Sequence, residues 1–107
     1  MTPEEIAESC LICVYHDVTA VVSLDGNGGL LGLRLFDTRF GAEHLAVHPK
    51  AREVWLITRH ADGWHGLYEE DRASIARVQS AVPQARLLVL IADEDTGCTR
   101  VGPEDWR

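Results

Sequence analysis

Apolar side chains near the start of the chain recur at helical spacing behind a well-formed helix start. Thr2 suits the N-cap, Pro3 suits the first helical position, and Glu5 completes a capping box. The apolar positions that follow at helical spacing are Ile6, Cys10, Cys13 and Val14. This pattern predicts a helix that begins at Pro3 and ends near residue 15.

Alternating apolar and polar residues then predict a β-hairpin. Segments 19–25 and 30–36 alternate and are joined by Gly26-Asn27-Gly28-Gly29, in which Asn-Gly is the strongest short hairpin signal. A two-residue Asn27-Gly28 loop places apolar residues opposite each other in the pairs Leu24 with Leu31, Val22 with Leu33, and Ala20 with Leu35. A slip of one residue would scatter these pairs. We therefore expect this leucine face to belong to the core.

Three further alternating segments predict a meander of strands, over residues 43–48, 53–60 and 64–68. Leu45 and Val47 alternate with histidine and alanine in the first segment, and a turn follows at residues 49–52. Asp62-Gly63 supplies a second hairpin loop of the same chemistry, between the last two segments.

The rest of the chain predicts a helix and a buried strand. Acidic residues at 69–71 suit a helix start, and Ile75, Val78 and Val82 form an apolar stripe that ends at Pro83. Residues 87–92 are apolar on both faces, as in a central strand, and a weak last strand follows at 98–101. We expect a single α+β domain over residues 1–107, with two helices and a mostly antiparallel sheet of five to six strands. The expected order is α-β-β-β-β-β-α-β(-β), where the bracketed strand is the weak one.

Composition and charge narrow the classes of function. The 107 residues suffice for one domain, and 46% are hydrophobic. The chain carries 10 basic and 17 acidic residues, a formal net charge of −7, so it repels phosphate backbones and we expect no nucleic-acid partner. No apolar stretch approaches the roughly 20 residues of a membrane span, and the N-terminus lacks a secretion signal. We expect a cytoplasmic protein without a membrane partner.

Cysteine and histidine pairs are the first candidates for metal chemistry. Cys10 and Cys13 have the spacing of half a zinc site, but they lie on an apolar helix and Cys98 is remote. We expect buried thiols without a disulfide, and no cofactor. His60 and His65 face each other across the Asp62-Gly63 loop, with Cβ atoms about 5 Å apart. They are weak metal candidates, because no third ligand is placed beside them.

The predicted meander has one apolar face and one mixed face. Leu45, Val47, Val54, Leu56 and Leu67 form the apolar face. The opposite face, which we call the mixed face, carries the candidate binding residues His44, His48, Trp55, Arg59 and Tyr68. Arg34 and Phe36 are also candidates and lie on this face if the hairpin turns its leucines to the core. Aromatic, histidine and arginine side chains are typical of binding hot spots and of small-molecule pockets. The alternative is a two-sided sheet whose mixed face is covered by the C-terminal segment with Trp106.

A binding module is the favoured function, because the sequence contains no complete acid, base, nucleophile or metal set. It would be a small, acidic, non-catalytic protein that takes a protein partner or a small molecule on the mixed face, and a homodimer fits the same surface. The alternative is a small metal-dependent hydrolase or nuclease that uses Asp93, Asp95 or Glu43 with a divalent ion. A third hypothesis is a homodimeric carrier with its pocket closed between subunits.

Overall fold

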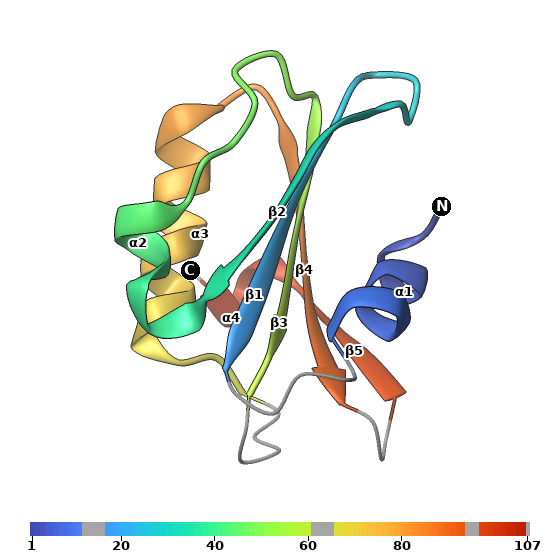
Figure 1. Ribbon diagram of the computed structural model, residues 1–107. Coiled ribbons are helices and arrows are strands. Elements are labelled where there is room, and N and C mark those ends of the chain that lie inside the picture. Colours follow the sequence, from blue (N-terminus) through green and yellow to red (C-terminus); the bar gives the residue numbers. More distant parts are fainter. Residues whose placement is uncertain (12–16, 61–65, 94–96, 107) are drawn as a thin grey trace.

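A mixed five-stranded sheet lies at the centre of the computed structural model, which describes residues 1–11, 17–60, 66–93 and 97–106. The strand order is β2-β1-β3-β4-β5 (Figure 1). The strands are β1 Val18–Leu24, β2 Leu30–Asp37, β3 Glu53–Arg59, β4 Arg86–Asp93 and β5 Gly97–Val101. β3 and β4 run parallel, and the other neighbouring pairs are antiparallel. The predicted α+β class with a mostly antiparallel sheet is confirmed.

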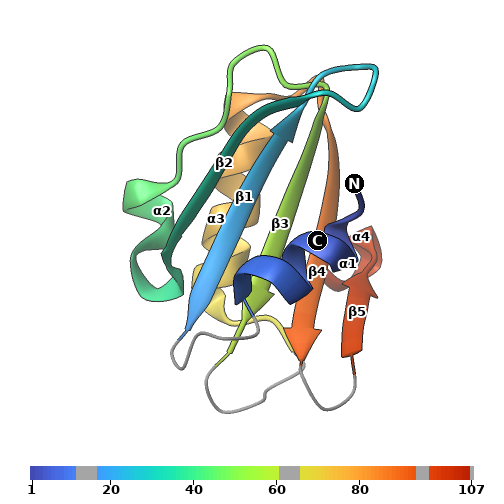
Figure 2. The ribbon, with the colours of Figure 1, turned by 45° about the vertical axis from the view of Figure 1, so that its right-hand side comes forward.

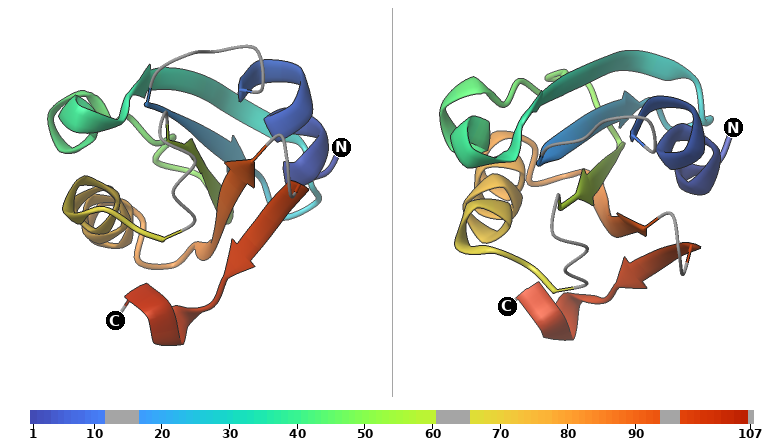
Figure 3. Two further views of the ribbon diagram at one scale, coloured as in Figure 1. Left: turned by 90° about the horizontal axis from the view of Figure 1, so that it is seen from below. Right: turned by 60° about the horizontal axis from the view of Figure 1, so that its bottom comes forward.

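Helices cover both faces of this sheet. α1, Pro3–Ile6, continues as a π-helical turn, Ala7–Leu11, on one side, while α2, Gly41–His44, and α3, Glu69–Ala81, lie on the other (Figures 1 and 2). The last helix, α4, is Pro103–Trp106. Seen from below, the sheet lies between α1 and α3 (Figure 3). We call the two faces the α1 side and the α3 side. None of the helices in the described ranges is long and apolar enough to cross a membrane.

Each side of the sheet buries its own apolar core. On the α1 side the fully or nearly buried members are Ala7, Val18, Ala20, Val22, Leu24, Trp55, Ile57, Leu90 and Ala92. On the α3 side they are Val21, Leu45, Ala51, Val54, Leu56, Ile75, Val78, Val82 and Val89. Because β1, β3 and β4 are apolar on both faces, they occupy the centre of the sheet, which confirms the central position predicted for residues 87–92.

The hairpin has the predicted register but a different loop. Val22 pairs with Leu33 and Ala20 with Leu35, whereas Leu24 pairs with Leu30 because the register shifts between Ser23 and Leu24. The loop contains three residues, since the N–H of Asp25 donates to the carbonyl of Gly29 at 2.8 Å. Gly28 adopts φ +82°, the left-handed conformation that such a loop requires at this position. The register shift compensates for the extra loop residue.

The predicted strand over residues 43–48 is wrong. After β2, a 3-10 turn at Thr38–Phe40 leads directly into α2, which ends at His44. Residues 45–48 have no regular structure. Leu45 is buried because its side chain joins the α3-side core, whereas Ala46 is exposed, so the apolar alternation does not arise from strand pairing. Residues 66–68 are also not a strand, and they lead directly into α3, while residues 64 and 65 lie outside the described ranges.

Candidate functional site

The expected mixed face does not exist as one surface. Val22 pairs with both Leu33 and Trp55, which places these three residues on the α1 side. Val21 pairs with both Arg34 and Leu56, so Arg34 lies on the α3 side. The prediction assumed that the leucines of the hairpin share the face of Leu56, whereas they share the face of Trp55. Arg34 and Phe36 are therefore separated from Trp55 by the sheet itself.

The other residues of the mixed face are also dispersed. Trp55 is only 6% exposed, because it lies beneath α1. This helix covers it, whereas we had considered the C-terminal segment as the cover. Arg59 is half-buried at the end of β3. His44 is exposed at the end of α2, with its ring edge-on to Phe40 at 6.2 Å. Tyr68 precedes α3 and packs its ring against His60, with the ring centroids 3.8 Å apart.

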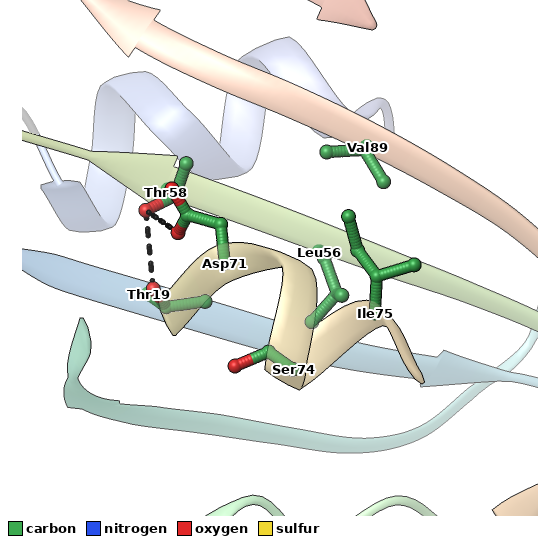
Figure 4. Close-up of a pocket in the computed structure, with 7 residues that line it drawn as sticks. All are labelled: Thr19, Leu56, Thr58, Asp71, Ser74, Ile75 and Val89. Atoms are coloured by element: carbon green, nitrogen blue, oxygen red, sulfur yellow. Dashed lines mark hydrogen bonds between the residues drawn. The ribbon is translucent and has the colours of Figure 1, made fainter. Parts of the chain in front are cut away.

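A buried polar cluster, which the sequence did not indicate, connects the start of α3 to the sheet. The hydroxyl of Thr19 lies 2.8 Å from that of Thr38 and 3.1 Å from that of Thr58. Thr58 donates to Oδ1 of Asp71 at 3.2 Å (Figure 4). The Thr58 hydroxyl also lies 3.4 Å from the carbonyl of Val18, and since a carboxylate and a carbonyl both only accept, its one proton goes to this pair, so Thr19 must donate to Thr58 and accept from Thr38. The threonines thus form a directed chain that ends on Asp71.

His60 completes this cluster from the end of β3. Its side chain is fully buried, with Nε2 2.9 Å from Oδ2 of Asp71 and Nδ1 3.7 Å from Oδ1 of Asp17. Neither ring nitrogen makes a well-aligned hydrogen bond to the described residues. Asp71 also accepts the N–H of Tyr68 at 2.8 Å, which caps the first turn of α3. The imidazole is therefore held between two carboxylates and beneath a tyrosine ring.

The cavity beside this cluster is too small to be a ligand site. It is lined by Thr19, Leu56, Thr58, Asp71, Ser74, Ile75 and Val89 (Figure 4). Its volume of about 10 Å³ corresponds to a single water molecule at most, whereas ligand pockets usually measure about 300–1,000 Å³. The hydroxyl of Ser74 is buried there without a hydrogen-bond partner among the described residues. We conclude that the cluster serves the fold, by fastening α3 to β1 and β3.

A larger groove lies on the α3 side, between the hairpin and the segment that follows α2. Its volume is about 260 Å³, and its lining residues are Val21, Ser23, Leu31, Gly32, Arg34, Ala46, Val47, His48 and Pro49. Two of the predicted binding residues, Arg34 and His48, meet here although they come from different elements. The lining contains one guanidinium, one imidazole and no carboxylate.

Hydrogen bonds orient His48 at this groove. Its backbone N–H donates to the hydroxyl of Ser23 at 3.1 Å, which anchors the segment to β1. Its Nδ1 accepts the N–H of Lys50 at 3.1 Å, so the neutral ring carries its proton on Nε2. The Nε2–H group is thereby left as a donor. Arg34 is exposed and makes no ion pair with any residue of the described ranges.

Two other hollows are larger, and neither is lined by a histidine. One, of about 420 Å³, lies between residues 45–47 and α3 and contains Arg77 and Ser80. The other, of about 520 Å³, lies beside Trp106, and its cation, Arg86, already faces Glu53 at 3.8 Å. The groove at Arg34 differs from both in combining an arginine with an oriented histidine donor.

The residues proposed for metal chemistry are not brought together in the part of the chain that the structure describes. No group of three histidine, cysteine or acidic side chains suited to a metal occurs within it. His65, Asp95 and Cys13 lie outside the described residues, and so do the side chains of Cys10 and Asp93. Glu43 is exposed on α2. Cys98 is half-buried against the α1-side core.

No protein-family model matches the chain, and no curated protein is significantly similar to it. The function must therefore be argued from the site alone.

Proposed function

We propose that this protein is a non-catalytic binding module, acting in the cytoplasm, that holds a carboxylate-bearing ligand in the groove between β2 and residues 46–49. The observation that carries the proposal is the meeting of Arg34 and His48 at a concave surface without an acidic lining residue. Arginine binds a carboxylate through two parallel N–H groups, and the Nε2–H of His48 can supply a further hydrogen bond.

The size of the groove limits the ligand. Its volume of about 260 Å³ is just below the usual range for small-molecule pockets, so it excludes a nucleotide cofactor and suits a short organic acid or one acidic side chain. Apolar floor residues, among them Val21 and Val47, would contact the aliphatic part of such a ligand. A free acid and the side chain of a protein partner therefore share the chemistry that the groove recognises.

A titration of the protein with a carboxylate ligand, monitored by NMR through the amide chemical shifts, tests the proposal. We expect succinate, or a short peptide with a single glutamate, to shift the amide signals of Gly32, Val47 and His48 in a saturable way. Arg34→Gln should weaken binding about tenfold or more, because a hydrogen bond to a charged group contributes roughly 1.5–3 kcal/mol.

The matched control is Arg77→Gln, which removes an arginine from the neighbouring hollow and should leave the affinity unchanged. Stronger binding of the peptide than of succinate would identify a protein partner as the source of the carboxylate. Unsaturable shifts in the wild-type protein, or equal affinity of the Arg34→Gln variant, would contradict the proposal.

A further inference from the structure

Cationic side chains gather around the groove, at the end of the sheet that carries the hairpin loop. Arg34 and His48 line the groove, and from His48 the chain continues through Lys50 and Arg52 into β3. This segment and the hairpin loop lie at the same end of the sheet (Figure 1). Arg34, Lys50 and Arg52 are exposed, and none of them makes an ion pair with a residue of the described ranges.

The carboxylates near this end are already engaged, although the chain has a formal net charge of −7. In the hairpin loop, Oδ1 of Asp25 accepts the N–H groups of Asn27 and Gly29, at 2.8 Å each. Glu53 faces Arg86 at 3.8 Å. Further acidic residues lie at the opposite end of the sheet, where β1 and α3 begin and β2 ends; these are Asp17, Asp37, Glu69 and Glu70. An acidic ligand is therefore attracted to the groove end of the molecule and repelled by the other end.

The positions of two arginines along β1 give the distance that such a ligand would span. Arg34 pairs with Val21. β3 pairs with β1 up to Leu24, and the N–H of Arg52 donates to the carbonyl of Leu24 at 2.8 Å, so Arg52 lies level with Asp25. These two levels are four positions apart on β1, which is roughly 13 Å along a strand.

The side chain of Arg52 lies against the hairpin loop. A β-carbon at Gly26 would be 3.8 Å from Cγ of Arg52. Strand alternation also puts Arg52 on the α3 side, which is the side of Arg34, because Glu53 pairs with Leu24 of the α1-side core. The two arginines therefore border the same side of the hairpin, one on β2 and the other at the loop.

A peptide segment matches this spacing better than a small acid or a nucleic acid does. Residues four positions apart in an extended chain are separated by the same roughly 13 Å, whereas a short dicarboxylic acid carries its two carboxylates much closer together. A chain with a net charge of −7 repels phosphate backbones. The charges and their spacing thus favour an acidic segment of a protein.

We propose that the partner is a protein that lays an extended segment along the groove, with two acidic residues about four positions apart. The first carboxylate binds to Arg34 and His48, and the inference rests on that part of the proposed function. The second carboxylate binds to Arg52 and Lys50 beside the hairpin loop. The apolar lining of the groove contacts the side chains between the two acidic residues.

Three peptides of nearly equal size test the spacing, with binding measured at low ionic strength because salt screens exposed charges. The first is Glu-Thr-Val-Thr-Glu, in which threonine and valine favour the extended form. The second has glutamine in place of the last glutamate, and the third, Thr-Glu-Glu-Val-Thr, has the same two charges side by side. We expect the first peptide to bind the wild type about fivefold more tightly than either of the others, which is the contribution of a well-aligned exposed ion pair.

A double variant, Lys50→Gln with Arg52→Gln, should remove this advantage and leave the affinity for the peptide with one glutamate unchanged. That unchanged affinity also shows that the groove of the variant is intact. The matched control is Arg72→Gln, which removes an exposed, unpaired arginine at the start of α3 and should keep the fivefold advantage.

The outcomes separate this inference from the function proposed for the groove. Equal affinity of the wild type for all three peptides, or an advantage that survives the double substitution, would overturn the acidic segment and leave the groove proposal standing. Arg34→Gln should weaken the binding of every peptide, and wild-type affinity of this variant would overturn both proposals. Binding of a short single-stranded DNA as tight as that of the first peptide would overturn the assignment to a protein partner.

Discussion

At the scale of single residues, Asp71 shows how a polar side chain can be required by the fold and still escape sequence reasoning. Its position in the first turn of α3 was predicted from helix-start chemistry, as one of three consecutive acidic residues. Nothing along the chain distinguished it from Glu69 and Glu70, which are exposed. Its contacts to Thr58 and His60 depend on how the end of β3 lies against the start of α3, so they emerge from the tertiary structure alone.

Removing the Asp71 carboxylate should destabilise the protein strongly. Asp71→Ala leaves the Tyr68 N–H without its acceptor and leaves the Thr58 hydroxyl only the more distant carbonyl of Val18, and we expect a loss of about 2–4 kcal/mol in the free energy of unfolding. Urea denaturation would measure this loss. Glu70→Ala, an exposed neighbour in the same turn, should change stability by less than about 0.5 kcal/mol. Equal midpoints for the two variants would refute a structural role for the cluster.

At the scale of elements, strand pairing was easier to predict than burial. The register of β1 and β2 followed from apolar alternation, and the structure confirms it for Val22 with Leu33 and for Ala20 with Leu35. Burial depends on what lies beside each strand, which alternation does not encode. β1 is central and buried on both faces, whereas β2 is an edge strand with exposed leucines. The error at residues 43–48 has the same origin, because Leu45 joins the α3-side core without belonging to a strand.

This difference between the strands predicts unequal effects of the same substitution. Val22→Asp buries an unpaired carboxylate in the α1-side core and should leave the protein unfolded. Leu33→Asp, at the paired position on β2, should remain folded, because Leu33 is 39% exposed. Circular dichroism and the dispersion of amide signals at low protein concentration would distinguish the two. If both variants unfold, the edge leucines contribute to the core as the sequence alone suggested.

At the scale of the whole molecule, the sheet is covered on both faces, and this decides how the candidate residues are distributed. The sequence placed Arg34, His48 and Trp55 on one surface, because nothing in it showed which face of the hairpin lies on the same side of the sheet as Trp55. Once α1 covers Trp55, the remaining candidates Arg34 and His48 are left on the α3 side, at the groove. Residue type alone selected Arg34 and His48 as candidates. Which candidates share a surface depends on the pairing registers of β1, β2 and β3 together.

The cover supplied by α1 can be tested through Ala7, which is fully buried against the α1-side core. Ala7→Glu places a charge between α1 and the sheet, where no partner lies within that apolar cluster. We expect the helix to detach and the free energy of unfolding to fall by about 2–4 kcal/mol. Trp55 should then become exposed to water, so the tryptophan emission should shift to longer wavelength. The amides of α3 should remain protected, because the α3-side core is separate.

Glu8→Ala, at an exposed position of the same turn, is the control and should leave both the emission and the stability as they are in the wild type. An Ala7→Glu variant with wild-type emission would mean that α1 is not what keeps Trp55 dry.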